Sequence, residues 1–348
     1  MDAFAVEQLD FSELQAAMDE ILNQSFSFQD TVLALLSGEQ PFTMESFLRM
    51  ALSEAGRSFA QEKQIFISIL VLGIAAALLT NFTNLFKNDQ IGEISFEMTY
   101  LLLFLLLLQI FTGAAELAGQ VLSSVQSFMK ALLPAWCLAV TLSAGSTTAL
   151  VFYQFMLGLI YLLDTLIGEV LLPVLNLYMM LVFVNHLTKE EYLSQMTELT
   201  GKGVGWLLKT LLAAVVGFNA IQGMITPALD ALKNTAFTRA LRVLPGIGNV
   251  AGGVTDLLLG SAVLLKNGVG AAAVLVLALI CLGPLVKLGV LFLLLKGTAA
   301  LIQPVCDKRF VGCVAGAGEG VRLLFQAVFT VTVLFVLTIV VVTVSVRL

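Results

Sequence analysis

Three carboxylates lie inside long apolar runs of this sequence, where charged side chains are rare. Asp164 and Glu169 are five residues apart around Gly168, and Asp256 lies in the second half of the chain. A charge at membrane depth is costly, so it usually pairs with an opposite charge or faces water along a path for ions or polar solutes. Both interpretations stay open, and one form of pairing joins Asp164 or Glu169 to Lys287. Three further lysines near the ends of apolar runs are expected to extend their amines toward the membrane interface: Lys209, Lys266 and Lys296.

A glycine-rich run at residues 237–270 separates two apolar segments. It holds too many glycines for a simple membrane span and is too apolar for an ordinary loop. Irregular backbone persists at membrane depth only inside protein or beside a wet cavity. We therefore predict a broken or re-entrant helix here. A polar path through the membrane could be lined by Asp164 and Glu169 together with residues of this run. The candidates in the run are Pro245, Gly248, Asn249, Gly252, Gly253, Asp256 and Ser261.

Two glycine pairs have the G-x-x-x-G spacing: Gly248 with Gly252, and Gly312 with Gly316. In membranes this spacing lets two helices approach closely. Close packing is the simpler interpretation, and a pore-lining role is the alternative. The two are compatible if the packed helices surround a channel.

No constellation in the sequence points to catalysis or to a cofactor. There is no Walker loop, no H-E-x-x-H and no G-x-S-x-G motif, and His186 is the only histidine. The four cysteines include no C-x-x-C pair, which disfavours a metal site, while a disulfide between Cys306 and Cys313 stays an open alternative. The net charge of −6 lacks the basic footprint of a nucleic-acid-binding protein. We expect no enzymatic activity, no metal, no cofactor and no nucleic acid partner.

The composition places the chain in a membrane. Hydrophobic residues make up 59% and charged residues 12% of it, whereas a typical soluble domain has about 25% charged residues. A helix needs about 20 apolar residues to cross the hydrocarbon core. We predict an all-α polytopic integral membrane protein with about eight transmembrane helices, one or two of them broken or re-entrant. The apolar segments behind this count are residues 65–86, 98–118, 132–142, 149–167, 170–187, 204–225, 271–283, 285–302 and 323–346.

Two regions follow from the charge pattern. Residues 1–62 form an acidic, amphipathic helical head, which we expect outside the cytoplasm because it carries few bases, and residues 63–348 form the multi-pass transmembrane domain. In the head, Ser27 and Asp30 predict a capped helix that Gly38 ends, and a later helix continues into the first span. The head is either a solvated hairpin lying against the membrane or a docking face for a partner.

The proline spacing suggests an internal repeat. Pro134 and Pro173 are 39 residues apart, and so are Pro245 and Pro284. The first proline of each pair, Pro134 or Pro245, precedes a predicted interrupted helix. In the first half of the chain, residues 143–148 form the interruption. Many transporters are built from such repeats, with discontinuous helices at the binding site. Coincidence among seven prolines is the alternative.

The central run RVLPGIGNVAGGVTDLLLGSAVLLKNGVG, the earlier ALLPAW and TLSAGSTTAL, and the late Ile302-Gln303-Pro304 resemble the stage III sporulation protein AE family (SpoIIIAE) of endospore-forming Firmicutes. The similarity extends from Lys63 to the C-terminus. The resemblance implies a multi-pass protein of the mother-cell membrane that surrounds the forespore. It also implies a complex with the other SpoIIIA-operon proteins, including an ATPase, and with the forespore protein SpoIIQ. It implies no catalytic residues.

Three functions remain open at this stage. The first is a membrane component of the SpoIIIA–SpoIIQ channel or secretion-like complex, contributing to a transport path that supports the engulfed forespore. The second is a non-conducting scaffold that recruits other subunits, and the third is a stand-alone secondary transporter. The acidic residues within apolar runs favour conduction, whereas the small-residue spacing and the amphipathic head favour assembly with partners, lipid or further copies of the chain.

Overall fold

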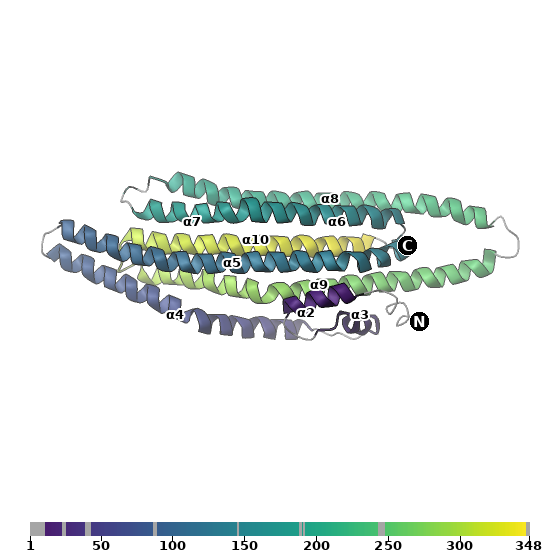
Figure 1. Cartoon of the computed structure of the whole chain (residues 1–348), viewed down its shortest axis with the longest axis horizontal. Helices are drawn as coiled ribbons and strands as arrows, with labels where there is room; N and C mark the ends of the chain where they lie inside the picture. The colour runs from purple at the N-terminus through teal and green to yellow at the C-terminus, as the bar shows by residue number, and fades with distance from the viewer. Residues whose placement is uncertain are drawn as a thin grey trace.

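The backbone of an apolar segment in lipid must satisfy its own hydrogen-bonding groups, and a helix does so within one segment. The structure, a computed structural model, accordingly consists of long helices packed side by side (Figure 1). It describes residues 11–22, 26–38, 43–85, 89–144, 146–187, 190, 192–242 and 248–345. Within these ranges, side chains are described except at residues 80–85, 89–92, 144, 147–148, 222–242, 248–259 and 345. Every secondary-structure element in these ranges is a helix, which confirms the all-α prediction.

Six long limbs run alternately in opposite directions along the bundle (Figure 1). The third limb contains a short π-helix, η1, between two α-helices. In chain order the limbs are α4 (Met44–Leu85), α5 (Asp89–Ala144), α6–η1–α7 (Ser146–Thr165, Leu166–Leu171 and Leu172–Leu187), α8 (Ser194–Arg242), α9 (Gly248–Ile302) and α10 (Lys308–Ser345).

Each limb is long and apolar enough to cross a membrane, which gives six candidate spans over the described residues where the sequence predicted about eight. The difference arises because apolar segments that the sequence treats separately join into single helices. Residues 98–118 and 132–142 both belong to α5, and residues 271–283 and 285–302 both belong to α9. Helix boundaries set by runs of polar residues are therefore misleading here, because a polar turn can continue a helix when its other face is buried.

Prolines stand inside several of these helices without ending them. Pro134 lies inside α5 and Pro284 inside α9. Pro173 is the second residue of α7, just after η1, and its ring would clash with the carbonyl four residues earlier in a regular α-helix. The wider π-turn at η1 relieves this conflict. The internal repeat stays a prediction, since Pro245 lies outside the described residues.

The head packs along the side of the bundle. Helix α2 (Ser12–Leu22) contacts α5, and α3 (Phe28–Leu36) contacts α9. The Ser27 hydroxyl accepts a hydrogen bond from the Asp30 backbone N–H, and Gly38 follows α3 with φ at 81°, as the sequence predicts. Helix α4 runs through residue 62 without a break, so the head and the first span share one helix.

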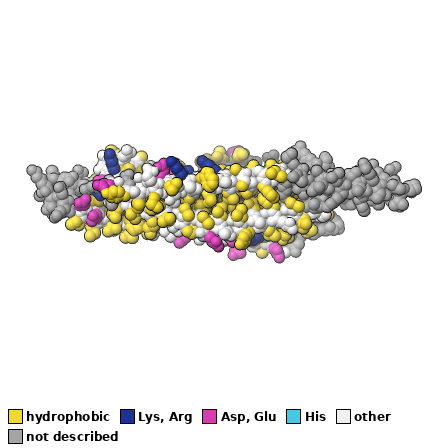
Figure 2. Space-filling view, turned by 90° about the horizontal axis from the view of Figure 1, so that it is seen from above, with side chains coloured by type: hydrophobic (Ala, Val, Ile, Leu, Met, Phe, Trp, Pro, Cys, Tyr) yellow, Lys and Arg dark blue, Asp and Glu magenta, His cyan; other side chains and the backbone are white. Residues whose placement is uncertain are grey.

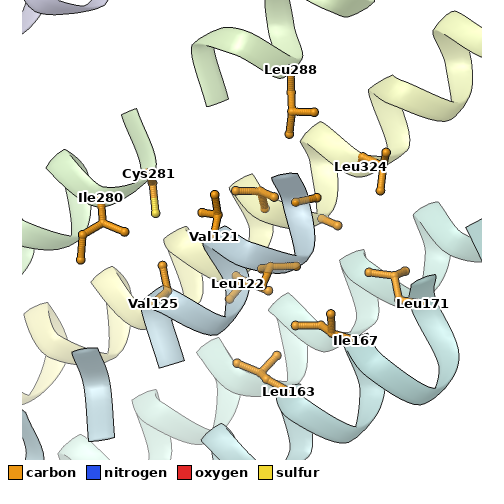
Figure 3. Packing of buried hydrophobic residues seen from close by; sticks show 14 of the residues in the cluster. Val121, Leu122, Val125, Leu163, Ile167, Leu171, Ile280, Cys281, Leu288 and Leu324 are labelled. Atoms are coloured by element: carbon orange, nitrogen blue, oxygen red, sulfur yellow. The ribbon is translucent and has the colours of Figure 1, made fainter. Parts of the chain in front are cut away.

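The interior of the bundle is mostly apolar. Figure 3 shows side chains of four limbs meeting at mid-length: Val121 and Val125 come from α5, Leu163 and Ile167 from α6 and η1, Cys281 and Leu288 from α9, and Leu324 from α10. All of them are buried. This packing fixes the orientation of α6, so the neighbours of Leu163 and Ile167 on its other side face outward.

Glycines bring α7 and α10 into close contact. An added Cβ at Gly312, Gly316 or Gly320 would lie 2.6, 2.5 or 2.6 Å from an atom of His186, Val182 or Met179, respectively. Side chains of one helix thus fill the space left by the glycines of the other. This confirms the close-packing interpretation for Gly312 and Gly316.

Candidate functional site

The predicted acidic residues lie on the outside of the bundle. Asp164 is near the end of α6 and Glu169 is in η1, and both are exposed, while Leu163 and Ile167 beside them are buried. The predicted ion pair of Asp164 or Glu169 with Lys287 is not formed. The Lys287 amine instead lies 3.6 Å from the carboxylate of Glu62 in α4.

The glycine-rich run is helical from Gly248 onward. Helix α9 continues without a break to Ile302, so within the described backbone the predicted interruption is not found after Gly248. Pro245 lies among residues 243–247, which are outside the description, and Ser261 is half-buried. The side chains of Asn249 and Asp256 lie outside the described set, as does the burial of Gly248, Gly252 and Gly253. The other predicted interruption, at residues 143–148, is the connection from α5 to α6 rather than a break within one span.

A polar surface on α5, which the sequence analysis missed, runs down the outside of this helix. Its exposed polar residues recur every three or four positions, which places them on one face. They span 21 steps of the helix, about 32 Å at 1.5 Å per residue, close to the roughly 30 Å thickness of the hydrocarbon core. We name this set the α5 polar stripe: Gln109, Thr112, Glu116, Gln120, Ser123, Ser127 and Lys130. The regular spacing of these polar residues is the signal in the sequence that could have revealed the stripe. Residues 119–131, however, fall between the predicted apolar segments 98–118 and 132–142, as a connection between spans would.

The α5 polar stripe and the acidic residues of the third limb lie at the same height. Helices α5 and α6 form an antiparallel hairpin. Ser127 is 17 residues before the end of α5, and Asp164 is 18 residues after the start of α6. Because Ser127, Asp164 and Glu169 are exposed, the hairpin carries polar groups on the outside at a height where its inside is mostly apolar (Figure 3). Figure 2 shows one face of the molecule, which is covered largely by hydrophobic side chains, with acidic side chains along its lower edge and near its left end.

One end of the α5 polar stripe meets the Glu62–Lys287 ion pair. A groove of about 320 Å³ between α4, α5 and α9 is lined by Glu62, Gln109, Gly113 and Lys287 together with apolar residues. Lys287 lies in an apolar stretch of α9, whereas Glu62 belongs to a polar turn of α4 with Gln61, Lys63 and Gln64. The groove thus extends the polar surface from α5 to α4 and α9.

A second polar region lies between α7, α8 and α10. A cavity of about 790 Å³ there is lined by Tyr178, Lys202, Lys209, Glu319 and Arg322 among others. We call it the α7–α8–α10 cavity. Carboxylates and bases alternate along its wall, so it is a charged space beside three apolar limbs.

Glu319 is the hub of an ion-pair network at this cavity. Its Oε1 accepts a hydrogen bond of 2.7 Å from Nε of Arg322, and its Oε2 lies 3.7 Å from the amine of Lys296 in α9. Arg322 also donates to Gln326 over 3.3 Å. One carboxylate therefore links two bases on two helices.

The three lysines expected to extend toward the membrane interface behave differently from one another. Lys296 pairs with Glu319, Lys209 is exposed, and Lys266 is fully buried at 0% exposure. The prediction is therefore wrong for Lys266. The α9 segment around it is covered by α3, as the contact of Gly268 with Leu36 shows.

The model of one protein family, described as stage III sporulation protein AE, matches residues 26–346. The chain belongs to the stage III sporulation protein AE family. Stage III sporulation protein AE of Bacillus subtilis (strain 168) is 23% identical to it over 317 residues, which cover 91% of this chain and 79% of the relative. No solved structure matches the chain.

Membership in the stage III sporulation protein AE family confirms the resemblance seen in the central glycine-rich run. The matched residues begin just before α3 and contain all six long limbs. The α5 polar stripe and the α7–α8–α10 cavity both lie inside the matched region. The chain is thus a sporulation protein with several helices able to span a membrane.

Proposed function

We propose that the chain is a membrane subunit of the SpoIIIA–SpoIIQ complex, in the mother-cell membrane around the engulfed forespore, and that it forms part of a transport path. Family membership supports the link to sporulation. The observation that carries the transport role is the α5 polar stripe, with Asp164 and Glu169 at its height on the neighbouring limb.

The cost of placing charged side chains in lipid favours water at this surface. Carboxylates and a lysine directed at lipid are costly, and such residues normally face a polar cavity or a partner. Exposed Glu116, Lys130, Asp164 and Glu169 form no ion pair within 4 Å in the described part of the chain. The interior of the bundle at the same height is filled mainly by apolar side chains (Figure 3), although Gln126 beside Ser127 is buried as well. A path is therefore expected on the outer side of the α5–α6 hairpin, closed by a neighbouring subunit or a second copy.

Thiol accessibility tests the path directly. In a variant without the four native cysteines, Ser127→Cys is expected to react with a membrane-impermeant thiol reagent in sporulating cells. A matched control is Phe329→Cys, an exposed apolar position on α10 five residues after Leu324 of the packed interior, which should stay unlabelled in lipid. A bulky thiol reagent at Ser127→Cys should then stop support of the forespore. Absence of labelling in sporulation-competent cells would contradict a water-filled path.

Charge neutralisation supplies the second arm of the test. The combined change Asp164→Asn and Glu169→Gln should reduce forespore support while the complex still assembles, because neither side chain contributes to the packed interior. Normal sporulation in this variant would remove both residues from the proposed path. The control Glu97→Gln changes an exposed carboxylate that also lies on α5 but belongs neither to the α5 polar stripe nor to the third limb, and it should have no effect.

A non-conducting scaffold is the second candidate, favoured by the length of the limbs, which offers surface for partners beyond one membrane thickness. In that case the α5 polar stripe is a contact with another SpoIIIA protein. Ser127→Cys would then be protected, and a bulky residue there, Ser127→Trp, would abolish co-purification of the complex. Co-purification unchanged by Ser127→Trp would exclude this alternative.

A further inference from the structure

Charges in the α7–α8–α10 cavity do not balance. The lining contains the bases Lys202, Lys209 and Arg322 and the carboxylates Glu198 and Glu319. Lys202 pairs with Glu198 in the next turn, and Arg322 pairs with Glu319. Lys209 has no carboxylate within 4 Å in the described part of the chain. One positive charge is therefore left for a ligand, and Lys296 beside Glu319 adds to the positive field.

The same cavity offers a hydroxyl to a ligand. Tyr178 is 5% exposed as a whole residue and lines the cavity. Its hydroxyl forms no hydrogen bond with another described residue, so it is available to a ligand that enters the cavity. Gly201 of α8 packs against its ring, since an added Cβ there would lie 3.2 Å from Cε2 of Tyr178. The ring is thus held in place on the cavity wall.

The opening of the cavity has the character of a membrane interface. Trp206 lines the cavity and is 70% exposed, so it stands where the cavity opens on the surface of α8. Tryptophan is enriched at the level of lipid headgroups. Exposed Leu199 and Met196 continue the apolar surface of α8 on the turns before it. A ligand with a charged head and an apolar body would match both parts.

We propose that the α7–α8–α10 cavity binds a phosphate group with a single negative charge, as in the phosphodiester of an anionic phospholipid headgroup. The phosphate oxygens accept hydrogen bonds from the Lys209 amine and the Tyr178 hydroxyl, and the acyl chains lie along the apolar surface near Trp206. Basic pockets between membrane helices bind anionic headgroups in this way. A monoanion balances Lys209 without displacing Glu198 or Glu319 from their bases.

Ligand-dependent thermal stability of the purified full-length protein in detergent tests the proposal. A ligand that binds only the folded state raises the unfolding temperature in proportion to the logarithm of its concentration. Phosphatidylglycerol should raise it, whereas phosphatidylcholine, whose headgroup has no net charge, should not. Lys209→Gln should weaken the apparent affinity for phosphatidylglycerol about tenfold, and Tyr178→Phe should weaken it less. The matched control Lys130→Gln removes an exposed lysine of α5 outside the cavity and should leave the affinity unchanged.

Soluble glycerophosphoglycerol, the singly charged headgroup diester without acyl chains, distinguishes the two sources of the phosphate. Stabilisation by phosphatidylglycerol but not by glycerophosphoglycerol, lost in Lys209→Gln, assigns the site to a lipid. Equal stabilisation by both, again lost in Lys209→Gln, assigns it to a free phosphodiester. Equal stabilisation by phosphatidylcholine, or an unchanged phosphatidylglycerol affinity in Lys209→Gln, overturns the proposal.

Discussion

The side-chain amide of Asn219 in α8 donates a hydrogen bond of 3.1 Å to the hydroxyl of Thr338 in α10. Both side chains are buried, at 2% and 0% exposure. The Asn219 amide also donates to the Val215 carbonyl, and the Thr338 hydroxyl donates to the Leu334 carbonyl. Each residue thus remains tied to its own helix while the pair joins two helices far apart in sequence.

We expect this pair to contribute modestly to stability. Asn219→Leu removes the interhelical bond but leaves the Thr338 hydroxyl bonded to its own helix, whereas Thr338→Val leaves a donor of Asn219 without its acceptor. A double-mutant cycle measured by reversible unfolding in detergent should give a coupling of about 0.6 kcal/mol, the average for such bonds in membrane proteins. Thr338→Val should be the costlier single change. A coupling indistinguishable from zero would mean that the two helices do not meet at this point.

The glycine contacts between α7 and α10 predict a steric effect. Gly316→Ala places its Cβ 2.5 Å from Cγ1 of Val182 and should cost about 1–3 kcal/mol through overpacking. Gly297→Ala, with nothing within 4 Å, should be neutral or stabilise the helix by up to about 1 kcal/mol. Adding Val182→Ala to Gly316→Ala should restore the unfolding temperature. Equal effects of the two alanines would show that α7 and α10 are not in close contact.

The two partly buried ion-pair sites should differ in strength. Glu319→Gln removes the charge shared by Arg322 and Lys296, while Glu62→Gln removes the partner of Lys287 alone. We expect a loss of about 1–2 kcal/mol for the first and about 0.5 kcal/mol for the second, since these side chains are partly exposed. Both losses should shrink in 0.5 M salt, as screening weakens the pairs. A larger loss for Glu62→Gln would contradict the role of Glu319 as the hub.

Cys306, in the connection between α9 and α10, should be a slow nucleophile. Burial raises the pKa of its thiol, and the neighbouring Asp307 carboxylate raises the pKa further. Because the thiolate is the reactive form, less of it is present at pH 8, and alkylation should accelerate as the pH rises through the elevated pKa. Asp307→Asn lowers the pKa and should speed alkylation at pH 8 by a factor of about 2–5. The rate is measured in a variant that keeps Cys306 as its sole cysteine, and a rate unchanged by Asp307→Asn would remove the carboxylate as a cause.

Local patterns in the sequence predict much of this structure. The cap at Ser27, the end of α3 at Gly38 and the continuation of the head into the first span all depend on neighbours within a few residues. The close approach at Gly312 and Gly316 depends on helical periodicity alone. The four cysteines are unpaired, which closes the alternative of a Cys306–Cys313 disulfide.

Choices that depend on distant parts of the chain could not be read from the sequence. Lys287 is near enough to Glu62 to pair with it only because α4 and α9 pack together, and Glu62 belongs to a segment assigned to the head. In the sequence alone, a connection between helices is suggested by the polar residues Gln120, Ser123 and Ser127. In the structure the helix continues because its other face is buried through Leu122, Val125 and Phe128. The cavity arises where three limbs meet, so no local pattern marks it.

The length of α5 limits how the bundle sits in a bilayer. Its 56 residues extend about 84 Å at 1.5 Å per residue, against about 30 Å of hydrocarbon. Tilting by the usual amount, about 20°, shortens its projection by only a small fraction. About 50 Å of the rod must then lie outside the hydrocarbon core on one or both sides, which gives this subunit the reach of a strut toward whatever lies beyond the membrane surface.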